Sequence, residues 1–248
     1  MFDRAQTLKA HFCELRNRLL VVVIFFIIIF TCCYYFAGYL QNLFIAPLQP
    51  ILNQGRELVY TNLPEAFFSE VNIAFFTSLL IVFPVLLSQI WIFLRPGLFG
   101  GEQKILRNVM LIIPALFYLG VGFAIKLVLP RAFSFFISFE HKNIPLYFLP
   151  KLSDYLNFTQ KLMFVFGLGF ELPVVLFALT RLNIVTLNDL KARWRLVVLI
   201  ICLVSAIITP PDALSMIALA LPMIALYGVT LLVIQWAQPI SLNKDYYA

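Results

Sequence analysis

Long runs of apolar residues fill most of this chain, and short polar segments separate them. Most runs hold about 20 residues, the length that an α-helix needs to cross the hydrocarbon core of a bilayer. Strict alternation of apolar and polar positions, typical of outer-membrane barrel strands, is missing. The pattern predicts six transmembrane helices, over about residues 19–40, 71–93, 105–129, 155–182, 196–208 and 214–234.

Prolines and glycines interrupt several of these runs, among them Pro84, Pro114, Gly120 and Pro173. A membrane helix accommodates such residues by kinking or by letting a neighbouring helix approach closely. We therefore expect an all-α integral membrane protein whose kinked helices form a concave bundle, built as a single membrane domain over residues 1–248. The fifth run is short, reaching roughly 20 Å at the rise of an α-helix, which implies partial insertion or local thinning of the bilayer.

The polar segments carry structure of their own. Apolar residues from Leu8 to Leu19 recur at helical spacing, which predicts a short amphipathic helix on the membrane surface before the first span. Residues 41–70 are too polar and too rich in proline to stay in lipid, so they are predicted as a loop. Residues 130–154 mix aromatic and charged side chains, which favours helical segments along the interface.

Basic residues are distributed unevenly among these segments. Most of the 18 lysines and arginines lie before the first span, between the second and third, between the fourth and fifth, or in the tail. The positive-inside rule then places both termini in the cytoplasm or its organellar equivalent. The same topology accounts for the net charge of +6, so nucleic acid is not expected as a partner.

Composition and reactive residues narrow the function classes. With 62% hydrophobic and only 12% charged residues, the chain is too apolar for a soluble domain. Its four cysteines have neither disulfide nor metal-site spacing. His11 and His141 are predicted on opposite sides of the bilayer, and no glycine-rich phosphate-binding loop is present. We therefore predict no catalytic residue, no metal and no cofactor.

Two carboxylates, Glu14 and Glu102, lie on the predicted cytoplasmic side. One interpretation gives each a local role: Glu14 forms an ion pair with Arg18 one helical turn later, and Glu102 is a favourable charge at a helix amino terminus. The other interpretation is that both face a cationic ligand. Carboxylates suit a guanidinium because they accept its paired donors in bidentate fashion.

Glu171 lies deep in the fourth predicted span. A carboxylate at that depth costs several kcal/mol if it is charged, so a functional site is the first interpretation. The alternative is a structural hydrogen bond to a neighbouring span, helped by the backbone groups that Pro173 leaves unpaired.

Four motifs in order along the chain resemble one family, TatC, the multispanning subunit of the twin-arginine protein translocase. The motifs are His11-x-x-Glu14-Leu15-Arg16-x-Arg18-Leu19-Leu20, Gln89-x-Trp91-x-Phe93-x-x-Pro96-Gly97-Leu98 leading to Glu102, Phe166-Gly167-x-x-Phe170-Glu171-x-Pro173, and Thr209-Pro210-Pro211-Asp212. The resemblance extends from about residue 8 to residue 236.

The resemblance implies a receptor that binds twin-arginine signal peptides on the cytoplasmic face and moves folded proteins across the membrane by the proton-motive force. It implies TatA-like and TatB-like single-span partners, self-association in a larger complex, and the bacterial inner membrane or an organellar equivalent. The residues that it assigns to signal-peptide recognition are Glu14, Arg16, Phe93 and Glu102. Those that it assigns to partner contact or translocation are Glu171, Pro47 and Asp212.

Two other functions are weighed against this one. A proton-coupled transporter of a small solute would use Glu171 as its coupling site, but transporters of that kind usually carry internal repeats, and none is visible here. A passive scaffold for other membrane proteins would bind cargo independently of Glu14 and Glu102.

Overall fold

A computed structural model describes residues 2–49, 58–94, 100–138, 151–181, 184–208 and 213–237. Within these ranges the chain is almost entirely helical, and the β structure amounts to an isolated parallel bridge between Val59 and Lys151. Five of the described helical segments are long and apolar enough to cross a membrane, and Trp194–Ile208 is a shorter apolar helix. The predicted class, an all-α membrane protein, is confirmed.

The first helix differs from the expected pair of helices. Helix α1 runs without a break over Phe2–Tyr35, so the amphipathic segment and the first span are one helix. The reason is local, because no glycine or proline occurs before Gly38. A break at Phe36 then separates α1 from α2 (Ala37–Ile45) and the 3₁₀ turn η1 (Ala46–Leu48).

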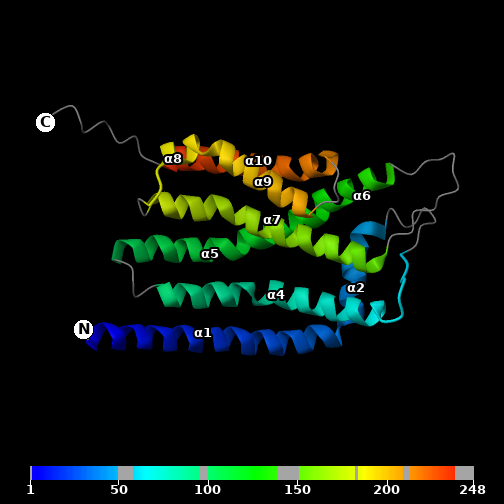
Figure 1. The fold of residues 1–248 in the computed structure, drawn as a ribbon, viewed down its shortest axis with the longest axis horizontal. Coiled ribbons are helices and arrows are strands. Elements are labelled where there is room, and N and C mark those ends of the chain that lie inside the picture. The colour runs from blue at the N-terminus through cyan, green and yellow to red at the C-terminus, as the bar shows by residue number, and fades with distance from the viewer. Residues whose placement is uncertain are drawn as a thin grey trace. The chain divides into compact units, whose positions relative to one another are not determined.

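Helix α4 (Glu65–Leu94) begins six residues before the expected start of the second span, and it lies alongside α1 (Figure 1). The ring of Phe26 in α1 packs edge-on against Phe75 in α4, with ring centroids 5.2 Å apart. Pro84 lies inside α4, as the sequence predicts.

The third apolar stretch extends beyond its expected end. Helix α5 (Gly100–Phe123) continues through a π-helical turn, η3 (Ala124–Val128), into α6 (Leu129–Ser138). Pro130 cannot donate a backbone hydrogen bond, and a widened turn accommodates such a residue within a helix. The helical part of the expected 130–154 segment is therefore α6, and residues 139–150 lie outside the described residues.

The carboxyl-terminal part holds four helices: α7 (Leu152–Arg181), α8 (Leu187–Ala192), α9 (Trp194–Ile208) and α10 (Ala213–Ala237). Helix α8 begins with a reciprocal capping box between Thr186 and Asp189. The hydrogen bonds from the Thr186 hydroxyl and backbone N–H lower the pKa of Asp189.

Two compact units make up the chain, Met1–Met110 with Ile125–Lys161, and Leu111–Ala124 with Leu162–Ala248. That the chain is a single membrane domain remains a prediction. In the first unit, the Tyr155 hydroxyl donates to the Phe44 carbonyl at 2.6 Å, and Asn72 donates to Asn157 at 3.1 Å. These bonds join α2, α4 and α7.

Within the second unit, α5 and α7 make a close backbone approach at Gly120. A Cβ at this position would overlap the carbonyl oxygen of Phe166, whereas a Cβ at Gly122 has no atom within 4 Å. Of Gly120 and Gly122, it is therefore Gly120 that allows the close packing expected from the sequence.

Gly120→Ala is expected to destabilise the protein by roughly 1–3 kcal/mol, because the two helices must separate to admit the methyl group. Gly122→Ala makes the same chemical change in open space and is the matched control. Thermal unfolding in detergent measures both variants. Equal melting temperatures for the two would contradict the packing described here.

Candidate ligand-binding groove

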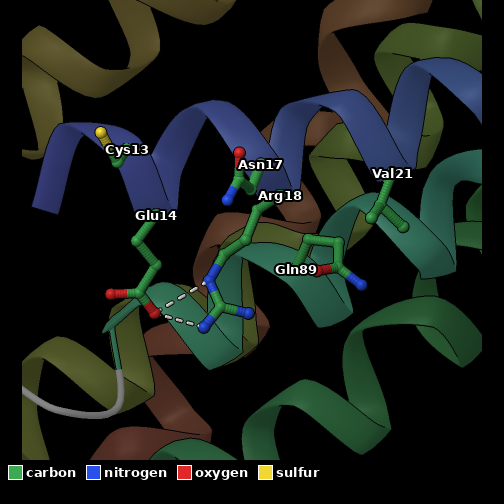
Figure 2. Close-up of a pocket in the computed structure, with 6 residues that line it drawn as sticks. All are labelled: Cys13, Glu14, Asn17, Arg18, Val21 and Gln89. Carbon is green, nitrogen blue, oxygen red and sulfur yellow. Dashed lines mark hydrogen bonds and ion pairs between the residues drawn. The ribbon is translucent and has the colours of Figure 1, made fainter. Parts of the chain in front are cut away.

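Helices α1 and α4 line an open groove of about 550 Å³. It is lined by residues spaced three or four apart on one face of α1, together with one side chain of α4 (Figure 2). The described lining residues are Cys13, Glu14, Asn17, Arg18, Val21 and Gln89. The groove is therefore polar and lies beside the first predicted recognition residue.

Glu14 forms the ion pair with Arg18 that its spacing predicts. The Arg18 Nε donates to Glu14 Oε1 at 3.2 Å, and Nη2 donates to the same oxygen (Figure 2). The Glu14 side chain is 37% exposed, so water still reaches this carboxylate. The contact demonstrates that the groove carboxylate can accept the donors of a guanidinium.

Arg16 and Phe93 lie elsewhere on the same two helices. Arg16 is exposed and its Nη2 donates to Asn17 at 3.5 Å. At 100° per residue, Arg16 is on the opposite face of α1 from Glu14, and the structure does not bring the two together at the groove. Phe93 is half-buried and follows Gln89 by four residues, which places it one turn beyond the groove on the same face of α4.

The other predicted site residues are described to different extents. Glu102 is the third residue of α5, a position where a negative charge stabilises the amino terminus of a helix. Its side chain lies outside the described residues. Asp212 lies outside them altogether. Pro47 is half-buried in the first turn of η1.

Glu171 is buried in α7, with 8% of its surface exposed. Its Oε1 has no hydrogen-bond partner among the described residues. The predicted structural bond from this oxygen to a neighbouring span is therefore not seen in the described part of the chain, and a role in binding remains a prediction.

Sequence reasoning missed Glu65, the first residue of α4. Its carboxylate accepts five hydrogen bonds, from the backbone N–H groups and hydroxyls of Thr61 and Ser153 and from the backbone N–H of Asn62. These bonds join the start of α4 to the start of α7. The Asn62-x-x-Glu65 spacing, which is typical of a helix amino terminus, is the feature of the sequence that could have indicated this role of Glu65.

Metal and disulfide chemistry receive no support from the described residues. Among them, no group of three or more His, Cys, Asp or Glu side chains is placed to hold a metal ion. All four cysteines are free thiols in the structure.

The long apolar helices define a multispanning membrane protein, and the groove on α1 and α4 holds a carboxylate that accepts a guanidinium. Residues 10–222 match the family model of the Sec-independent protein translocase protein (TatC). The chain belongs to the TatC family. The transporter alternative is not favoured, because relatives across nearly the whole length are named protein translocase components.

The relatives cover the chain almost completely. TatC of Rickettsia prowazekii is 36% identical over 97% of this chain and 97% of its own length. TatC of Escherichia coli K12 is 34% identical over 92% of this chain and 87% of its own. A crystal structure of the twin-arginine translocase receptor TatC superposes with a TM-score of 0.82 at 29% identity, covering 92% of this chain and all of that one.

Proposed function

We propose that this protein is the receptor for twin-arginine signal peptides in a bacterial translocase, with its groove on the cytoplasmic face of the inner membrane. The observation that carries the proposal is the Glu14 carboxylate, which already holds a guanidinium at an open groove. A peptide with two neighbouring arginines presents the same donor group. Family membership supports the translocation of folded proteins as the activity that this binding serves.

Each predicted residue takes a role in this proposal. Glu14 and Glu102 accept the two guanidiniums, and Phe93, one turn beyond Gln89, contacts the apolar residues that follow them in the peptide. Arg16, on the other face of α1, donates to the groove residue Asn17 and keeps its expected role in recognition through that contact. Both termini are cytoplasmic in this arrangement.

The remaining three residues serve assembly or transport. Glu171, buried and with one oxygen unpartnered among the described residues, suits a polar group on the transmembrane helix of a TatA-like or TatB-like partner. Pro47 and Asp212 lie on the opposite side of the membrane in the predicted topology. Several copies of the chain join these partners in a larger complex, which is driven by the proton-motive force.

A photoreactive amino acid placed at Val21 tests where the peptide binds. Val21 lines the groove, and Val23, two residues later on the opposite face of α1, has a similar exposed fraction, 42%. We expect a twin-arginine peptide to crosslink to position 21 and not to position 23, in membranes that contain the full chain. Equal labelling of both positions, or labelling that persists when lysines replace both peptide arginines, would contradict the proposed site.

A further inference from the structure

Arg18 places an arginine of the protein itself on the groove carboxylate. Its Nε and Nη2 both reach Glu14 Oε1, and its side chain is 21% exposed, so most of this side chain is withdrawn from solvent. In Figure 2 the Arg18 guanidinium extends along the groove beneath α1 to the carboxylate. Any cation that binds Glu14 from outside must displace this group or share the carboxylate with it.

The chemistry of the pair favours exchange for another guanidinium over exchange for an ammonium. Both of the Arg18 contacts given above end on one oxygen of Glu14. A guanidinium that approaches end-on can instead form two parallel hydrogen bonds, one to each carboxylate oxygen, which is the stronger arrangement. An ammonium is a compact point charge and cannot form that fork.

We propose that Arg18 sets the affinity of this site, as an internal guanidinium that competes with the arginines of the ligand for Glu14. Competition lowers the affinity of every cationic peptide by the same factor. Only peptides whose intrinsic affinity is high, those with a guanidinium fork, then remain bound at working concentrations. This inference rests on the proposed function, because it requires Glu14 to receive the ligand.

A positioning role for Arg18 predicts the opposite change in the dissociation constant of the peptide. If Arg18 held the Glu14 carboxylate in the orientation that the ligand needs, removal of Arg18 would weaken peptide binding. If Arg18 competes, its removal strengthens binding. The direction of one change in dissociation constant therefore separates the two roles.

The test uses the purified full chain in lipid nanodiscs and a fluorescent synthetic peptide with two consecutive arginines before an apolar segment. Arg18→Gln is expected to lower its dissociation constant about two- to fivefold, the range that partly exposed ion pairs give. The dissociation constant of a twin-lysine version of the peptide should fall by the same factor. Arg18→Lys keeps the charge but replaces the two guanidinium contacts with those of an ammonium, so its decrease in dissociation constant should be smaller yet measurable.

Two controls separate competition from net charge and from the proposed function. Arg107→Gln removes an exposed positive charge of α5 and should leave the dissociation constant unchanged. In a Glu14→Gln background, Arg18→Gln should change the dissociation constant no more than Arg107→Gln does. The proposed competition would be overturned if Arg18→Gln weakens peptide binding, or if it lowers the dissociation constant no more than Arg107→Gln does. If Glu14→Gln alone leaves binding unchanged, the proposed function fails instead.

Discussion

Replacing Glu65 with alanine is expected to lower the melting temperature by roughly 5 °C or more, because it removes the acceptor for five hydrogen bonds. The backbone N–H groups of Thr61 and Asn62 and the Ser153 hydroxyl all donate to this one carboxylate, at 2.6 Å, 3.2 Å and 2.7 Å. Its side chain is buried, so no bulk water takes its place without rearrangement.

Glu70→Ala is the matched control for this change. It removes the same side chain from the same helix, but Glu70 is half-buried and outside the Glu65 network. Thermal unfolding of both variants in one detergent, followed by near-ultraviolet circular dichroism, measures the difference. If the two variants melt together, the network does not stabilise the junction of α4 and α7.

Glu14→Gln is expected to weaken binding of a twin-arginine peptide roughly 10- to 100-fold, the range for loss of a charge-assisted hydrogen bond. Two physical effects add in this variant. The peptide loses its bidentate acceptor, and Arg18 keeps a positive charge beside the groove that Glu14 no longer neutralises. Glu102→Gln is expected to weaken binding in the same direction.

Crosslinking or fluorescence anisotropy with the peptide measures these losses, and Asp3→Asn is the control for charge. Asp3 lies three helical turns before Glu14 in α1, so the variant loses one negative charge from the same helix without changing the groove. Undiminished, arginine-dependent binding by Glu14→Gln would contradict the assignment of this carboxylate.

The helices could be predicted from the sequence because their determinants are local. Long apolar runs between polar segments gave the positions of α4, α7, α9 and α10 to within a few residues, apart from the early start of α4. The continuity of α1 was missed, although the absence of glycine and proline before Gly38 carries that information. The break at Phe36 has no comparable signal in the sequence.

The candidate site was predictable only in part. The Glu14–Arg18 pair follows from a spacing of four residues on one helix. The place of Gln89 in the groove could not be predicted, because it depends on how α1 and α4 align along each other. Ser153 likewise donates to a carboxylate 88 residues away in sequence, a pairing that the fold alone creates.

The most direct test of the receptor assignment compares two peptides on two proteins. The dissociation constants of a twin-arginine peptide and its twin-lysine counterpart are measured for the natural chain and for Glu14→Gln. We predict that the natural chain prefers arginine by about tenfold or more, and that Glu14→Gln loses most of this preference. An unchanged preference in Glu14→Gln would show that Glu14 does not read the arginines.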